Sequence, residues 1–177
     1  SRLHQMTGPG EYRAMTALLL LGPATPMLFQ GQEFGASAPF HYVAGVERSL
    51  GDRIDAGRKK ELAQFPSLSL PEVQAAMRRP DDPLTFAACK LDWDEVGRHG
   101  AMLALHRDLL RLRREDPTLA RQERPDGAVI GPAAFALRFR GEGGQDRLLL
   151  INLGLDLELS IMPEPLLAPP AGHDWTL

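Results

Sequence analysis

The first pattern along the chain is a run of apolar and small residues that ends abruptly. Nearly every position from Ala14 to Leu21 is apolar or small, which predicts a helix that is buried on several sides. Thr7 is a candidate N-cap for this helix, and Pro9 suits its first turn. Gly22-Pro23 cannot continue a helix, so we expect it to end there.

A short apolar segment follows, "TPMLFQG", which begins at Thr25. We expect it to be a strand, because it is apolar on both faces, as strands of a covered parallel sheet are. A buried helix, a tight turn and such a strand are typical of α/β proteins. The stretch then becomes polar and aromatic in "QGQEFGASAPFHY", which predicts that the strand ends at the floor of a site.

Residues after Gly35 predict a long, mainly helical excursion. The segment "DRIDAGRKKELAQF" favours an amphipathic helix with Ile54 and Leu62 facing inward. The segment "SLPEVQAAMRRP" indicates a short helix with Ser69 as its cap and Pro71 in its first turn.

The clearest helix is predicted from roughly Val96 to Glu115. Its apolar positions recur at helical spacing, and its arginines fall mostly on the opposite, outer face. The apolar set is Met102, Leu105, Leu109 and Leu112, and the arginines are Arg107, Arg111, Arg113 and Arg114.

From about Gly127 the pattern changes to a period of two. In "AFALRFR" every second residue is a large apolar one, "GEGGQD" is a hairpin-type turn, and "RLLLINLG" predicts a second strand. The segment "LDLELSIM" alternates again, with one face formed by Leu155, Leu157, Leu159 and Ile161. These segments predict an antiparallel sheet or sandwich, with the domain boundary near residues 120–126.

Composition and charge argue against several classes of partner and cofactor. The chain has 177 residues, of which 44% are hydrophobic and 24% charged, as in a protein with a folded core. A net charge of −3 argues against nucleic acid or an anionic membrane as a partner. The single cysteine, Cys89, cannot form an internal disulfide, and we expect a structural thiol in a cytoplasmic protein. We find no metal-ligand spacing or phosphate-binding loop, so we predict no cofactor.

The candidate site residues are Gln32 and Glu33 at the predicted strand end, followed by Phe40, His41 and Tyr42. Glu33 either holds a ligand hydroxyl or pairs with an arginine of a neighbouring strand. Aromatic rings beside polar groups suit a carbohydrate cleft, although rings also anchor ordinary loops. Glycoside hydrolysis needs two carboxylates that face one bond, and the sequence offers no such pair. We therefore assign His41 no acid–base role and predict only part of a site.

These motifs together resemble the α-amylase family of glycoside hydrolases. "RAMTALLLLGPATPMLFQGQEFGASAPF" is similar to the last helix–strand step of the family's barrel. "GRKKELAQF", "DDPLTFAACKLDWDE" and "ALHRDLLRLRRED" resemble the trehalose-releasing branch of that family. The resemblance implies an α/β plus all-β fold: residues 1–122 would be the C-terminal part of a TIM (β/α)8 barrel, and residues 123–177 a truncated antiparallel β-sandwich domain.

The resemblance also implies a reaction, the retaining hydrolysis of the α-1,4 bond next to the terminal trehalose of malto-oligosyl trehalose. The family's catalytic Asp, Glu and Asp fall before this segment, and both chain ends look like cuts, so we expect the chain alone to be inactive. Glu33 and Phe40 keep the family's residue type, whereas Gln32 stands where a second Glu is expected. Three alternatives remain: a glucan-binding module, a structural module or a branching enzyme. Uncovered sheet edges would favour self-association.

Overall fold

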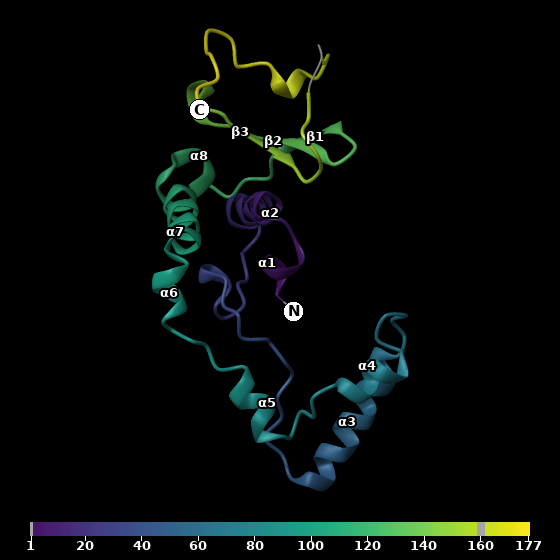
Figure 1. Cartoon of the computed structure of the whole chain (residues 1–177). Helices are drawn as coiled ribbons and strands as arrows, with labels where there is room; N and C mark the ends of the chain where they lie inside the picture. Colours follow the sequence, from purple (N-terminus) through teal and green to yellow (C-terminus); the bar gives the residue numbers. More distant parts are fainter. Residues whose placement is uncertain (1, 159–161) are drawn as a thin grey trace. The chain divides into compact units, whose positions relative to one another are not determined.

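The computed structural model describes residues 2–158 and 162–177. Its elements follow the chain in the order α1 (Leu3–Met6), α2 (Pro9–Leu21), η1 (Gln32–Phe34), α3 (Arg48–Leu62), α4 (Pro71–Ala76), α5 (Pro83–Ala88), α6 (Glu95–Arg98), α7 (Gly100–Glu115), α8 (Pro117–Ala120), β1 (Asp126–Gly131), β2 (Ala134–Phe139), η2 (Glu142–Gly144), β3 (Arg147–Asn152) and η3 (Pro165–Leu167) (Figure 1). No helix among the described residues is both long enough and apolar enough to cross a bilayer.

The chain forms two compact units. We call Leu3–Gly35 together with Glu95–Leu177 the sheet unit, and Ala36–Asp94 together with Arg2 the helical unit. The domain boundary predicted near residues 120–126 stays a prediction, and β1 begins at Asp126. In the structure, however, helices α2 and α7 share one compact unit with the strands that follow them.

The sheet is antiparallel, in the order β1-β2-β3. Strands β2 and β3 pair in continuous register, for example Phe135 with Ile151, and the Gly-rich turn joins them as predicted. Between β1 and β2 the register shifts at Val129, which marks a bulge. The predicted continuation of the sheet from Leu155 is not seen, because residues 155–158 form no strand and Leu155 is 93% exposed. Leu159 and Ile161 lie outside the described residues.

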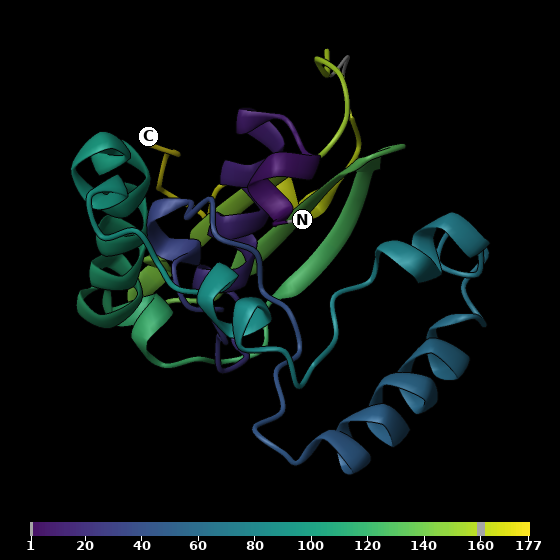
Figure 2. The same cartoon turned by 60° about the horizontal axis from the view of Figure 1, so that its bottom comes forward.

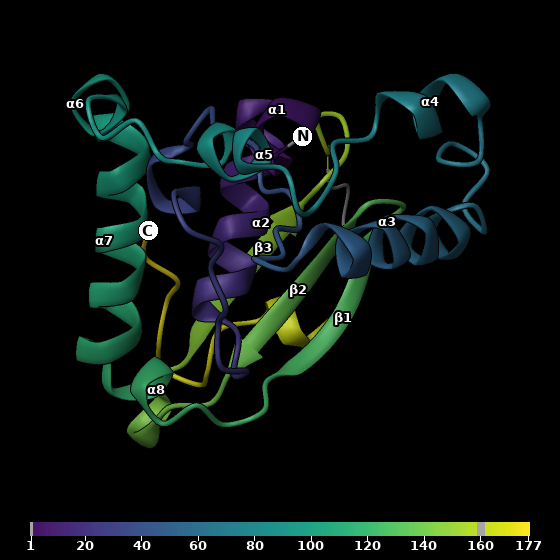
Figure 3. The same ribbon diagram turned by 90° about the horizontal axis from the view of Figure 1, so that it is seen from below.

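Successive side chains of a strand point to opposite faces of the sheet, and both faces are covered by other parts of the chain. On one face Phe139 packs with Leu21 and Leu119 from the helices. On the other face a cluster of Ile130, Ala134 and Ala136 receives Leu157 and Leu167. Figure 1 shows the C-terminal segment and α2 on opposite sides of the sheet, and Figure 3 shows α2 between α7 and the strands.

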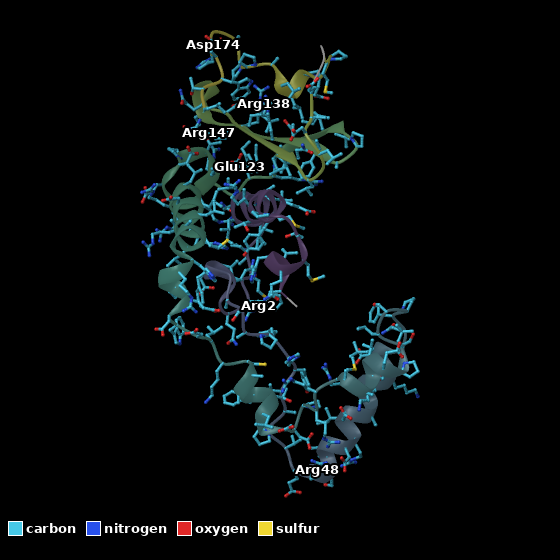
Figure 4. The ribbon with its side chains drawn as sticks, viewed as in Figure 1. Arg2, Arg48, Glu123, Arg138, Arg147 and Asp174 are labelled. Carbon is cyan, nitrogen blue, oxygen red and sulfur yellow. The ribbon has the colours of Figure 1, made fainter. Side chains whose placement is uncertain are left out.

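A charged side chain lies inside the second face. Arg138 of β2 is 5% exposed and donates to Asp146 at 2.7 Å and to the carbonyl of Ala168 at 2.7 Å. Its guanidinium also lies 5.3 Å from the ring centroid of Trp175. The labelled Arg138 thus comes from the sheet and faces the C-terminal segment (Figure 4).

Helix α2 agrees with the prediction in its extent and its burial. No residue from Ala14 to Leu21 is exposed, and the helix ends before Gly22. Its N-cap is Gly8 rather than Thr7, whose hydroxyl donates to the carbonyl of Leu3 instead.

The predicted helix from Val96 is divided in two. Helix α6 ends at Arg98, and α7 begins at Gly100. Leu112 is 42% exposed, and Arg113 is not on the outer face, because its guanidinium bonds backbone carbonyls at the end of α2. Helical spacing predicted the helix but not this contact.

The strand predicted from Thr25 does not form in this structure. Residues 25–29 have no regular secondary structure, Met27 is 74% exposed and Phe29 is 52% exposed. A strand requires a neighbour for its N–H and C=O groups, and the described strands all lie between Asp126 and Asn152 and pair with one another. The apolar pattern therefore has no sheet to join here.

In the helical unit, α3 is a regular helix that a loop connects to α4 (Figure 2). Ile54 and Leu62 of α3 are half-buried, whereas its fully buried residues are Gly51 and Asp55. Ser69 does not cap α4, because its hydroxyl donates to the carbonyl of Pro66. Polar contacts therefore contribute more to this unit than the amphipathic pattern suggested.

Candidate functional site

Three of the five predicted site residues line one cavity of the helical unit. The cavity has a volume of about 390 Å³, and Phe40, His41 and Tyr42 form one of its sides. Its other lining residues come from α3 and from residues 68–78: Asp55, Arg58, Lys59, Leu68, Val73, Ala76, Met77 and Arg78. This cavity lies entirely within one unit, so its geometry is defined by the chain itself.

Two backbone bonds hold the segment that carries the aromatic residues. The N–H of His41 donates to the sulfur of Cys89 at 3.3 Å, and the N–H of Ala44 donates to the carbonyl of Pro80 at 2.8 Å. Cys89 is buried, so its thiol serves as a packing and hydrogen-bonding group, in line with the structural role predicted for it.

The aromatic rings are open to solvent. Phe40 is 57% exposed and Tyr42 is 50% exposed. The guanidinium carbon of Arg58 lies 4.5 Å from the centroid of the Tyr42 ring, a cation–π contact that occupies one ring face. Exposed rings held by their backbone can stack on the apolar C–H face of a sugar.

The cavity carries positive charge. Lys59 pairs with Asp55 at 2.8 Å, and this leaves Arg58 and Arg78 among the lining residues. The pKa of His41 is lowered, chiefly by partial loss of hydration and then by the positive charges of Arg78 and Arg58. The imidazole is therefore neutral at neutral pH and can both donate to and accept from a hydroxyl group.

In the helical unit, a polar cluster connects α3 with residues 79–81. Arg79 donates to Asp81 at 2.9 Å and to Asp52 of α3 at 2.7 Å. The hydrogen bond from Arg79 lowers the pKa of Asp81. A side chain at Gly51 would overlap the Asp81 carboxylate, so only glycine permits this approach of α3 to residues 79–82. The cluster thereby anchors Arg79, which directly follows Arg78 of the cavity lining.

Gln32 and Glu33 lie elsewhere, on η1 of the sheet unit, and do not line this cavity. Glycines in the left-handed region flank them, with φ of 77° at Gly31 and 61° at Gly35. The side chain of Gln32 accepts from the N–H of Phe29 at 3.2 Å, which closes the turn locally. Glu33 is half-buried and forms no ion pair with any described residue, so the arginine partner considered from the sequence is not found in this part of the chain.

Sequence reasoning missed the charged lining residues. Arg58 lies four positions from both Ile54 and Leu62, so the predicted inward face of α3 already contained it. Asp55 and Lys59 occupy the neighbouring row of the same helix. No group of three or more metal-ligating side chains occurs among the described residues.

The chain is similar in sequence and in structure to known proteins. Residues 123–177 match a family described as a domain of unknown function, DUF3459. A malto-oligosyltrehalose trehalohydrolase of Deinococcus radiodurans is 44% identical over 160 residues, which are 88% of this chain and 26% of that protein. The enzyme of the same name from Arthrobacter ramosus is 41% identical over 119 residues, 66% of this chain and 20% of that protein.

A solved structure is also similar. The crystal structure of a candidate α-amylase from Salmonella typhimurium is 30% identical, with a TM-score of 0.74, over 92% of this chain and 28% of that one. The resemblance predicted from the sequence is thus confirmed. The chain spans about a quarter of the length of these relatives.

Proposed function

Because this chain is a relative of the malto-oligosyltrehalose trehalohydrolases, we propose that it forms the C-terminal part of a glycoside hydrolase of the α-amylase family. The reaction is hydrolysis of the α-1,4 bond next to the terminal trehalose of malto-oligosyl trehalose, which releases trehalose. The observation that carries this proposal is the 44% identity to a protein of that name over 88% of the chain.

In the proposed architecture, residues 1–122 complete a (β/α)8 barrel and residues 123–177 form its β-domain. The exposure of Met27 and Phe29 supports the first part, because the apolar side chains of a closing barrel strand are covered only when the other strands of the barrel are present. The DUF3459 match, which begins at residue 123, supports the second.

The chain's own contribution is to bind substrate. Phe40 and Tyr42 offer rings for stacking, and neutral His41 offers a hydrogen bond to a sugar hydroxyl. Gln32 and Glu33 of η1 are proposed as further substrate contacts, made from the sheet unit. A retaining mechanism needs a nucleophile and an acid/base carboxylate, and we propose that both come from residues outside this chain, so that the chain alone releases no trehalose.

Trehalose release tests the proposal. The whole protein that contains this chain, incubated with malto-oligosyl trehalose, is expected to release trehalose, whereas new branch points would indicate a branching enzyme instead. Replacement of the Tyr42 ring is expected to raise KM about fivefold with little change in kcat, because stacking contributes about 1 kcal/mol. Phe65→Ala is the matched control for Tyr42→Ala, since Phe65 is also 50% exposed but does not line the cavity.

A glucan-binding module is a second candidate, because the cavity beside Phe40 and Tyr42 is complete within this chain. Calorimetric titration of the chain with maltoheptaose distinguishes the two. Affinity that Tyr42→Ala abolishes and Phe65→Ala preserves would support binding by this chain alone.

We also propose a cytoplasmic location for the protein and self-association for the isolated chain. The single cysteine supports a cytoplasmic location. Exposed apolar residues beside the strand β1 edge, among them Val129 at 81%, support self-association of the isolated chain, and a monodisperse monomer in light scattering would contradict it.

A further inference from the structure

We propose that Tyr12 and His99 are positioning residues that hold the turn Gly31–Gly35, that Arg113 fixes the backbone leading toward it, and that the three together keep the carboxylate of Glu33 in the orientation that substrate recognition requires. This inference rests on the proposed function, in which Glu33 faces the substrate. All four residues belong to the sheet unit, so their geometry is defined within one compact body.

Arg113 fixes the path of the chain into the turn. Its guanidinium donates to the carbonyls of Leu20 at 2.7 Å, Gly22 at 2.5 Å and Ala24 at 2.8 Å. The last carbonyls of a helix have no partner within it and carry partial negative charge. A guanidinium there is therefore stabilised both by hydrogen bonds and by a favourable charge interaction. One side chain of α7 thereby determines the direction in which the backbone leaves α2.

Tyr12 holds the middle of the turn. Its hydroxyl donates to the carbonyl of Gln32 at 3.0 Å, and its side chain is 1% exposed. The ring lies edge-on to His4 at 6.0 Å and at a tilt to His106 at 6.4 Å. Because the core fixes the ring, the hydroxyl is a donor at a fixed place directly before Glu33.

His99 holds the end of the turn. Its Nδ1 lies 2.9 Å from the carbonyl oxygen of Phe34. A carbonyl can only accept, so this ring nitrogen carries the proton and donates. Phe34 is itself 1% exposed, which fixes the residue directly after Glu33 in the core.

These contacts share one property: every acceptor is a backbone carbonyl, so the three donors constrain the chain and not a particular side chain. The Glu33 side chain remains half-buried and has no ion pair among the described residues. Backbone anchors on both sides of an unpaired carboxylate are what a site needs in order to present that group in one orientation.

The first experiment needs no substrate. The N–H of Gly35 donates to the same Gln32 carbonyl that Tyr12 contacts, so hydrogen exchange of the Gly35 amide reports on the turn directly. Tyr12→Phe and His99→Leu are expected to speed exchange at residues 32–35 about tenfold, the equivalent of one lost hydrogen bond, while exchange in β2 stays unchanged. His99→Asn, which keeps a donor near the Nδ1 position, is expected to restore the slow rate.

The second experiment tests positioning through Glu33 in the whole protein. Tyr12→Phe and Arg113→Met are expected to raise KM for malto-oligosyl trehalose about tenfold and to change kcat less than about twofold. In a Glu33→Gln background, Tyr12→Phe is expected to raise KM no further, because residues that act through one group are not additive. Arg111→Met is the control, since Arg111 lies on the same helix, is 61% exposed and pairs with Asp108, which is equally exposed.

The outcomes separate the two proposals. If the whole protein releases no trehalose, the proposed function fails, while the exchange rates still decide whether these residues hold the turn. Unchanged exchange at Gly35 in Tyr12→Phe would overturn the inference, and so would additive effects of Tyr12→Phe and Glu33→Gln on KM. A general loss of stability in His99→Leu that His99→Asn does not restore would also contradict it.

Discussion

The two units differ in what they bury. In the sheet unit the largest buried side chains are mainly apolar or aromatic, such as Leu20, Phe34 and Phe139. In the helical unit the buried residues are mostly small or polar, such as Asp55 and Thr85. The hydroxyl of Thr85 donates to the carbonyl of Arg79 at 2.7 Å, so even this buried group is part of the polar cluster.

This difference indicates how each unit responds to its surroundings. Apolar burial is non-directional and tolerates small shifts, and its strength scales with the area removed from water. Hydrogen bonds and ion pairs depend on geometry, pH and salt. We therefore expect the sheet unit to supply most of the stability and the helical unit to be the part that conditions or ligands adjust.

The largest contrast is expected from one phenylalanine in each unit. Phe139 is 4% exposed and packs with Leu21, so Phe139→Ala leaves a cavity and is expected to cost roughly 3–5 kcal/mol of unfolding free energy. Phe86 in α5 is 55% exposed, and Phe86→Ala is expected to cost less than about 0.5 kcal/mol. Urea denaturation of both variants measures the difference, and equal losses would remove the contrast.

A smaller effect is expected from the buried ion pair of the sheet unit. Arg138→Met leaves the Asp146 carboxylate buried without its main partner, and we expect a loss of about 3 kcal/mol. The pair between Arg140 and Asp126 is more than half exposed on both sides, so Asp126→Asn is expected to cost less than about 1 kcal/mol. The same denaturation experiment compares them, with Asp126→Asn as the control for a lost charge.

The dependence of unfolding free energy on pH, at acid pH, tests the lowered pKa of Asp146. Burial alone would raise its pKa, but the N–H of Gly141 and the charge of Arg138 outweigh burial and lower the pKa. A carboxylate with a lowered folded-state pKa stabilises the fold above its unfolded pKa of about 3.9, and this contribution is lost as pH falls through the folded-state pKa. The stability difference between wild type and Asp146→Asn should therefore shrink below about pH 4. A difference that stays constant down to pH 2 would contradict this.

The smallest effect is expected in the polar cluster of the helical unit. Arg79→Met removes the bonds to Asp52 and Asp81, and we expect faster hydrogen exchange in α3, with exchange in the sheet unchanged. High salt should weaken the same contacts in the wild type. Arg48→Met is the matched control, because Arg48 also approaches Asp52, at 3.7 Å, but is 74% exposed. Equal effects of the two variants would argue against the cluster.

Local patterns predicted the elements that depend on local interactions. Helix α2 and the β2–β3 hairpin were predicted because their periodicity and their turn residues are contained in the segments themselves. The strand predicted from Thr25 does not form in this structure, because pairing depends on neighbours that no local pattern contains. Arg113 was placed outward for the same reason, since its acceptors are carbonyls about ninety residues away.

The candidate site was likewise predicted only where its residues are neighbours in the sequence. Phe40, His41 and Tyr42 are adjacent in sequence, so finding one of them found all three. Arg58 and Arg78 required the fold of the helical unit to bring α3 and residues 68–78 to the same cavity. The anchors of Glu33 are Tyr12 of α2 and His99 at the N-cap of α7, on either side of it in sequence, and no motif connects them.

Arg138 has a consequence for the order of folding. Its guanidinium joins a strand, a hairpin turn and the carbonyl of Ala168, and until Asp146 is in place that charge would be enclosed without compensation. The hairpin between β2 and β3 closes over a short loop, so its entropic cost is low and it can form early. We expect the C-terminal segment to dock last, onto a sheet that already carries its counter-ion, as the final step in the assembly of this face.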